Sequence, residues 1–245
     1  MSLTCPLSIA FAFLTRLPVR VGAAENADVG RALAFFPVVG LALGMALAAG
    51  AWLAGALPPG VAAVGLVALL AAATGGLHLD GLADVFDGLG GSHGDRERVL
   101  AIMRDSRIGA HGALALLLVV LAKVFAASVA LQRGNLWVVA LFPAVARWAV
   151  VPLIVAFPYV REVGLGSTFK DRGSTVELAW STLFVLLMLL WAGIRAVVPA
   201  AVALATALGF GLWMRRRLGG LTGDAYGAAI ELAEVAFLTV ATRGL

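Results

Sequence analysis

Long apolar runs separated by short polar stretches make up most of this chain of 245 residues. Runs of about 18 or more apolar residues are long enough for a helix to cross a membrane. The pattern therefore predicts an all-α, polytopic integral membrane protein with six or seven transmembrane helices, in one domain covering 1–245. A short N-terminal helix should end before Pro18. The expected spans are 33–57, 61–79, 108–131, 136–157, 176–194, 197–214 and 225–240.

Composition supports the same class of protein. Hydrophobic residues make up 62% of the chain and charged residues 13%, whereas soluble domains have about 45–50% apolar and about 25% charged residues. The formal net charge of +4 is modest, and basic residues do not alternate with aromatic ones, so we expect no nucleic-acid partner. Membrane lipid is an expected partner, and assembly into a homo-oligomer stays open. A single cysteine excludes an internal disulfide.

The distribution of Lys and Arg predicts the topology. With a cytoplasmic N-terminus, the polar loops at 80–107, 158–175 and 215–224 share one side, and nearly all loop Lys and Arg residues fall there. The opposite side holds only Arg133, Arg195 and Arg243. Because basic loops stay in the cytoplasm, the Gly-rich polar loops should cluster on the cytoplasmic face.

The stretch GGLHLDGLADVFDGLGG, residues 75–91, carries three acids in an apolar setting. On a helix that continues the second span, Asp80, Asp84 and Asp87 would form one stripe, at offsets of four and seven residues. Their mutual repulsion near a bilayer is relieved by a divalent cation, and oxygen ligands favour Mg²⁺, Mn²⁺ or Ca²⁺. A solvated acidic loop is the alternative. His78 could orient a carboxylate, contact phosphate or be structural.

A second polar patch, IMRDSRIGAHG, covers residues 102–112. Arg104 and Arg107 enclose Asp105 and Ser106, and His111 follows. Since the arginine fork recognises phosphate in a bidentate manner, we interpret this patch as a phosphate-binding site. The alternative is that the arginines only fix the topology.

The third patch is RRRLGGLTGDAYGAAIELAE, residues 215–234. Asp224, Glu231 and Glu234 lie near one helix face, and acids in a membrane segment are functional candidates. They would complete a metal site or bind substrate.

Weaker candidates lie elsewhere. Arg31 precedes the FFPVVG stretch, and the loop at 161–173 offers Ser167, Thr168 and Lys170 for a phosphate or nucleotide. Arg147 and Lys123 fall within spans, where we expect Arg147 to pair with a carboxylate, and Lys123 to pair or to reach the membrane surface.

Acids suited to a divalent metal, arginines suited to phosphate and Gly-rich loops together indicate phosphoryl transfer at a membrane surface. The motifs TGGLHLDGLADVFDG, IMRDSRIGAHG, EVGLG and LGGLTGDAYGAAIELAE, with FLTRLPV and FFPVVG near the N-terminus, closely resemble the cobalamin synthase family. This family is also called adenosylcobinamide-GDP ribazoletransferase, and the resemblance covers nearly the whole chain.

The resemblance implies a Mg²⁺-dependent enzyme of the bacterial inner membrane that performs the last step of cobalamin nucleotide-loop assembly. Adenosylcobinamide-GDP and α-ribazole, or its 5′-phosphate, would give adenosylcobalamin, or its 5′-phosphate, and GMP. The ribazole 5′-oxygen would attack the phosphorus on the cobinamide side. In this chain Asp80, Asp84 and Asp87 would hold Mg²⁺, Asp87 or Asp105 would be the base, and Arg104 and Arg107 would bind phosphate. Further substrate-site candidates are Ser106, His111, Arg31, Asp224 and Glu231, with a catalytic role open for His78.

Two other functions stay open from the residues alone. A CDP-alcohol phosphotransferase also uses spaced aspartates, but in the pattern D-G-x-x-A-R, whereas this chain has D-G-x-x-D-x-x-D-G. A cation transporter would place acids at mid-membrane depth on several spans.

Overall fold

The computed structural model describes residues 4–21, 26–92, 94–161 and 165–243. Within them the regular secondary structure is helical, joined by turns and loops, with an isolated β-bridge between Tyr159 and Leu221. Two 3-10 helices, η1 (Leu33–Phe35) and η2 (Ile194–Ala196), precede α3 and α11. The α-helices are α1 (Thr4–Leu14), α2 (Asn26–Ala32), α3 (Phe36–Leu53), α4 (Pro59–Thr74), α5 (Leu77–Gly91), α6 (Arg96–Ile102), α7 (Ala110–Gln132), α8 (Leu136–Ala156), α9 (Leu165–Arg172), α10 (Thr175–Ala192), α11 (Val197–Leu218) and α12 (Gly223–Ala241).

The all-α, polytopic class expected from the sequence is confirmed. In the described part of the chain, five helical segments are long and apolar enough to cross a membrane, and α4 with α5 would add a sixth if this bent pair is one span. The five agree with the runs expected at 33–57, 108–131, 136–157, 176–194 and 197–214. They are Asp28–Leu53, Ala110–Gln132, Leu136–Ala156, Thr175–Ala192 and Ile194–Leu218.

Two expected spans differ from the structure. The second does not continue to residue 79, because the chain breaks at Gly75 and Gly76 and turns by 89° before α5 starts. Both glycines have positive φ, 63° and 70°, which other residues rarely adopt. The run expected at 225–240 is α12, a helix that carries three acids and is not among the apolar spans.

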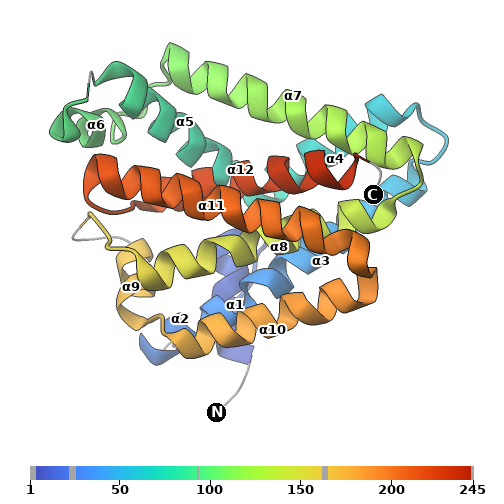
Figure 1. The fold of residues 1–245 in the computed structure, drawn as a ribbon, viewed down its shortest axis with the longest axis horizontal. Coiled ribbons are helices and arrows are strands. Elements are labelled where there is room, and N and C mark those ends of the chain that lie inside the picture. Colours follow the sequence, from blue (N-terminus) through green and yellow to red (C-terminus); the bar gives the residue numbers. More distant parts are fainter. Residues whose placement is uncertain (1–3, 22–25, 93, 162–164, 244–245) are drawn as a thin grey trace.

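The centre of the molecule is α8, which packs against α3, α10, α11 and α12 (Figure 1). Glycines bring α3 and α8 into backbone contact. A Cβ atom at Gly44 would lie 1.9 Å from the carbonyl oxygen of Ala140, and one at Gly40 would lie 2.4 Å from that of Pro143. Small residues at this spacing let two membrane helices approach closely.

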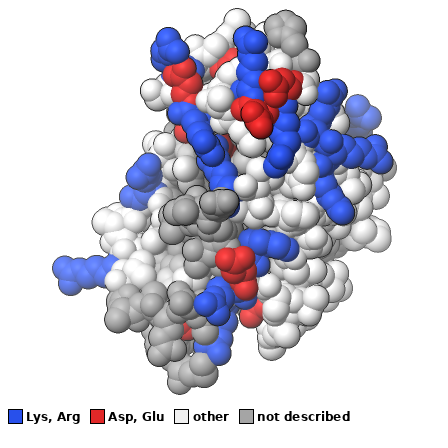
Figure 2. All heavy atoms as spheres, turned by 90° about the vertical axis from the view of Figure 1, so that its left-hand side faces the viewer, with Lys and Arg blue, Asp and Glu red and all other residues white. Residues whose placement is uncertain are grey.

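Polar loops gather at one end of the helix bundle. In Figure 1 the helices α6 and α9 lie at the left end, and Arg96 of α6 donates a hydrogen bond to the carbonyl oxygen of Leu218 at the end of α11, at 2.8 Å. Figure 2 shows Lys, Arg, Asp and Glu side chains grouped on this end. The expected clustering of the three polar loops on one face is therefore confirmed, and this face carries the candidate site.

Candidate active site

Two helices bring four acids to one place. Asp80, Asp84 and Asp87 all lie on α5, whose Gly81 packs on the backbone of Asp224 at the start of α12. The Asp84 carboxylate is repelled by the other three acids and attracted by Arg161. The sequence therefore correctly placed the acids on one helix, and tertiary packing adds Asp224 to them.

Asp224 is held by Arg161 from the segment after α8. The Arg161 Nη2 atom donates to Oδ2 of Asp224 at 2.6 Å. Hydrogen bonds from Val160 N–H to the Leu221 carbonyl, and from Leu221 N–H to the Pro158 carbonyl, join the two segments. Asp224 also lies in the first turn of α12, where the positive end of the helix dipole favours an acid.

Asp87 has a structural task that its spacing did not reveal. Its buried carboxylate accepts hydrogen bonds from the backbone N–H of Gly109, at 2.7 Å, and of Gly112, at 2.8 Å, so it caps the start of α7. A Cβ atom at Gly109 or Gly112 would lie 2.4 or 2.3 Å from its oxygens. Asp87 thus anchors the loop between α6 and α7, and its oxygens face that loop's backbone.

A cavity of about 440 Å³, called here the acidic cavity, opens beside Asp80 and Asp84. Ser106 and Arg107 line the same cavity, so the second polar patch does meet the first. Its lining is Gly75, Gly76, Asp80, Ala83, Asp84, Ser106, Arg107, Ile108 and Leu116.

Asp105 orients Arg107 at this cavity. The Arg107 guanidinium donates to both carboxylate oxygens of Asp105, from Nε at 3.0 and 3.2 Å and from Nη2 at 2.6 Å. Hydrogen bonds from Arg107 lower the pKa of Asp105 to about 2. A carboxylate with so low a pKa is a poor proton acceptor, which argues against Asp105 as the general base. Arg104 and His111 are exposed and do not line this cavity.

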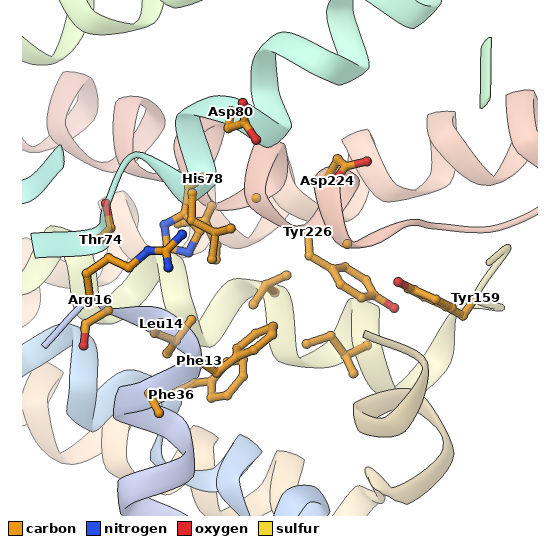
Figure 3. Close-up of a pocket in the computed structure, with 18 of the residues that line it drawn as sticks. Phe13, Leu14, Arg16, Phe36, Thr74, His78, Asp80, Tyr159, Asp224 and Tyr226 are labelled. Carbon is orange, nitrogen blue, oxygen red and sulfur yellow. The ribbon is translucent and has the colours of Figure 1, made fainter. Parts of the chain in front are cut away.

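A second cavity, of about 370 Å³, is also lined by Asp80 and is called here the aromatic cavity (Figure 3). The rings of Tyr159 and Tyr226 stack in it, with centroids 6.0 Å apart. Its lining is Ala12, Phe13, Leu14, Thr15, Arg16, Phe36, Thr74, Leu77, His78, Asp80, Val150, Ile154, Tyr159, Arg161, Gly223, Asp224, Tyr226, Gly227 and Ile230. Asp80 is therefore common to both cavities.

Glu231 and Glu234 lie in neither cavity. Both are buried and pair with Lys123 of α7, and Glu234 also accepts a hydrogen bond from Nη1 of Arg147 at 2.7 Å. The pairing expected for Arg147 is confirmed, and Lys123 pairs rather than reaching the surface. The substrate or metal role expected for Glu231 has no geometric support, because its carboxylate is bonded to Lys123 inside the bundle.

The remaining candidates are placed as follows. His78 is buried at the aromatic cavity, near Arg147, Glu234 and Lys123. Arg31 pairs with Asp28 at 3.5 Å and lines another cavity. Lys170 donates to the Val155 carbonyl at 2.7 Å. Residues 162–164, part of the EVGLG motif, and the side chains of Ser167 and Thr168 lie outside the described residues.

Sequence reasoning missed four side chains of the aromatic cavity, which are Arg16, Tyr159, Arg161 and Tyr226. From the sequence, Arg16 and Arg161 belong to the basic residues that indicate topology. The backbone N–H of Arg16 donates to the Ala73 carbonyl at 2.8 Å, which joins the end of α1 to the end of α4. Two sequence features could have indicated these residues: Arg16 lies in the FLTRLPV motif, and Tyr226 lies between Asp224 and Glu231 in the third polar patch.

The fold and the site define a class: a helical membrane protein with a cluster of carboxylates and arginines at one end of its bundle. The profile of the cobalamin-5-phosphate synthase family, CobS, matches residues 6–242. The chain therefore belongs to this family, as its motifs indicated.

Curated relatives carry the name adenosylcobinamide-GDP ribazoletransferase. The protein from Geotalea daltonii is 43% identical over 235 residues, which cover 93% of this chain and 92% of the relative. The protein from Pseudomonas putida is 42% identical over 94% of this chain and 95% of the relative, and the one from Roseiflexus sp. is 42% identical over 97% and 89%. No solved structure matches the chain.

Proposed function

We propose that this protein is an adenosylcobinamide-GDP ribazoletransferase, which joins adenosylcobinamide-GDP to α-ribazole or its 5′-phosphate and releases GMP. The observation that carries the proposal is the acidic cavity, whose lining includes Asp80, Asp84, Ser106 and Arg107, in a chain of this family. Carboxylates that recruit a divalent cation, opposite an arginine, suit a pyrophosphate.

Mg²⁺ is the cofactor that we propose, and the donor set fits it. Asp84 has three acidic neighbours and one basic one, so a bound cation would offset the repulsion among the carboxylates. Carboxylate oxygens are the ligands that Mg²⁺ prefers. In the described part of the chain no three Asp, Glu, His or Cys side chains are grouped closely enough to enclose a metal. Asp80 and Asp84 would therefore hold Mg²⁺ together with phosphate oxygens and water, as Mg²⁺ commonly binds.

Each residue of the acidic cavity then has a distinct task. Mg²⁺ held by Asp80 and Asp84 would neutralise charge on the pyrophosphate and on the departing GMP. Arg107, oriented by Asp105, binds a phosphate oxygen. The Ser106 hydroxyl, which lines the same cavity, donates a hydrogen bond to a second phosphate oxygen. Asp87 holds the loop that carries both residues against α5.

The attacking group is a ribose hydroxyl of the acceptor. The family is described as making a cobalamin 5-phosphate. The 5′-oxygen of that acceptor already carries phosphate, so we propose another ribose hydroxyl in place of the 5′-oxygen nucleophile that the resemblance implied. The hydroxyl oxygen forms a bond to the phosphorus on the cobinamide side, and the bond from that phosphorus to the bridging oxygen breaks to release GMP. Asp224 lines the aromatic cavity and is not one of the proposed Mg²⁺ ligands, so it is the carboxylate that we propose as the acceptor of the hydroxyl proton.

We propose that the helix bundle spans the inner membrane of a bacterial cell and that its polar end lies on the cytoplasmic side. The excess of Lys and Arg in the loops at this end supports that orientation. Lipid would cover the exposed apolar side chains on the sides of the bundle, such as Leu190 and Trp191, which are 77% and 71% exposed.

An assay of the purified protein with two substrate pairs tests the proposal. With adenosylcobinamide-GDP, α-ribazole and Mg²⁺, we expect GMP release that requires all three. With CDP-diacylglycerol and an alcohol, we expect no CMP. CMP release would contradict the proposal and favour a phospholipid-forming enzyme, and ion flux through proteoliposomes without nucleotide would favour a transporter.

A further inference from the structure

We infer that the aromatic cavity is the subsite for the nucleoside acceptor, and that it selects a flat, apolar base over guanine. The inference rests on the proposed function and deepens it. The proposed reaction has a donor and an acceptor, and the protein has two cavities that share Asp80 in their linings. The corrinoid is too large for a cavity of about 370 Å³, so the choice lies between the acceptor nucleoside and the guanosine of the donor.

Two buried polar atoms belong to side chains that line this cavity and are available to a ligand. The Tyr226 hydroxyl and Nδ1 of His78 have no hydrogen-bond partner among the described residues, although both side chains are only 4% exposed. Leaving such groups unpaired is costly, and buried polar atoms without partners are rare. Both side chains line the cavity, and Figure 3 shows Tyr226 extending into it. A ligand with hydrogen-bonding groups would satisfy both atoms.

The cavity is polar on one side and apolar on the other. Figure 3 shows Phe13, Leu14 and Phe36 across the cavity from Asp80 and Asp224. Val150, Ile154 and Ile230 add to the apolar lining. A nucleoside fits this division when its base lies on the phenylalanines and its ribose hydroxyls point to Asp80 and Asp224.

The apolar side also distinguishes the two bases. Guanine presents two N–H donors and a carbonyl on its edge, which need acceptors and donors in the pocket that receives them. The phenylalanine side offers none in its side chains. Ribazole has a benzimidazole base with an apolar edge and one free ring nitrogen, to which the Tyr226 hydroxyl can donate.

The test is binding of α-ribazole to the protein in lipid nanodiscs, measured by calorimetry, with guanosine as a second probe. Tyr226→Phe removes a hydroxyl that has no hydrogen-bond partner among the described residues, so the melting temperature of this variant should equal or exceed that of the wild type. The lost hydrogen bond to the ligand should weaken α-ribazole binding by about 3-fold to 10-fold. Guanosine should bind the wild-type protein at least about 10-fold more weakly than α-ribazole. Thr206→Val, which deletes a hydroxyl of α11 outside both cavities, is the matched control and should not change binding.

The outcomes separate this inference from the proposed function. Equal α-ribazole affinity of wild type and Tyr226→Phe, or guanosine that displaces bound α-ribazole as effectively as free α-ribazole does, overturns the subsite. If Tyr226→Phe fails to fold, Phe13→Leu takes its place, and unchanged α-ribazole affinity would again overturn the inference. Wild-type protein that binds α-ribazole but releases no GMP overturns the proposed function and leaves the subsite standing. If the wild type releases GMP and Tyr226→Phe has an unaltered KM for α-ribazole, the subsite is overturned and the proposed function stands.

Discussion

Gly81 of α5 lies so close to α12 that a Cβ atom on it would stand 2.7 Å from the carbonyl oxygen of Asp224 and 2.9 Å from its Cα atom. No side chain fits between the two helices at this point. The contact sets the distance between the α5 acids and Asp224, and therefore the shape of both cavities around Asp80.

Gly81→Ala should force α5 and α12 apart and displace Asp80. Because displacements of about 1 Å can cost about 100-fold in rate, we expect kcat/KM for GMP release to fall by about that factor. The matched control is Gly65→Ala on α4, where a Cβ atom meets nothing within 4 Å. Equal activities of the two variants would show that close approach at Gly81 does not matter.

Asp87→Asn tests whether Asp87 caps α7 or binds metal. An amide retains one acceptor oxygen for the two N–H groups of Gly109 and Gly112, so one hydrogen bond to a charged group is lost. We expect the free energy of unfolding to fall by about 1.5–3 kcal/mol, measured by thermal or denaturant unfolding. The Mg²⁺ concentration for half-maximal GMP release should not change. If Asp87→Asn is as stable as the wild type but needs more Mg²⁺ for half-maximal GMP release, Asp87 is a metal ligand instead.

Lys123→Met should strongly destabilise the bundle. It leaves Glu231 and Glu234 with a single basic partner, Arg147, and removing one member of a buried ion pair costs about 3–5 kcal/mol. Adding Glu231→Gln restores charge balance and leaves the Arg147–Glu234 pair intact. The double variant should therefore melt at a higher temperature than Lys123→Met alone. A double variant less stable than either single variant would contradict charge balance as the reason for this cluster.

Asp105→Asn should weaken donor binding, because Arg107 loses the carboxylate that orients its guanidinium. We expect a higher KM for adenosylcobinamide-GDP with little change in kcat. The depressed pKa of about 2 keeps Asp105 ionised at any pH above about 4, so the contact contributes above that pH and is lost only as the pH falls through about 2. In the wild type this KM should therefore not depend on Asp105 titration near neutral pH. A large fall in kcat with unchanged KM would instead indicate a catalytic role for Asp105.

The sequence predicted the parts of this protein that depend on local pattern. Most spans follow from apolar runs, and the common helix of Asp80, Asp84 and Asp87 follows from their spacing. The bend at Gly75 and Gly76 was missed because an apolar run across two glycines reads the same whether the helix continues or breaks there.

Contacts between distant segments could not be predicted from local pattern. Asp87 caps a helix that begins about 22 residues later, and nothing near it in the sequence shows that Gly109 supplies the donor. Glu231 and Asp224 share a helix face by spacing, yet one pairs with Lys123 and the other with Arg161, because α7 and the 158–161 segment lie at different depths along α12.

The most direct test of the central claim, that Asp80 and Asp84 hold Mg²⁺ for the pyrophosphate, is the Mg²⁺ dependence of GMP release by Asp84→Asn and the wild type in the same membranes. The structure assigns Asp84 no hydrogen bond to another described residue that Asn would lose, so expression and insertion should be normal. We expect wild-type release to rise to saturation with Mg²⁺ and Asp84→Asn to release no GMP at any Mg²⁺ concentration. Near-normal release by Asp84→Asn at saturating Mg²⁺ would contradict the claim.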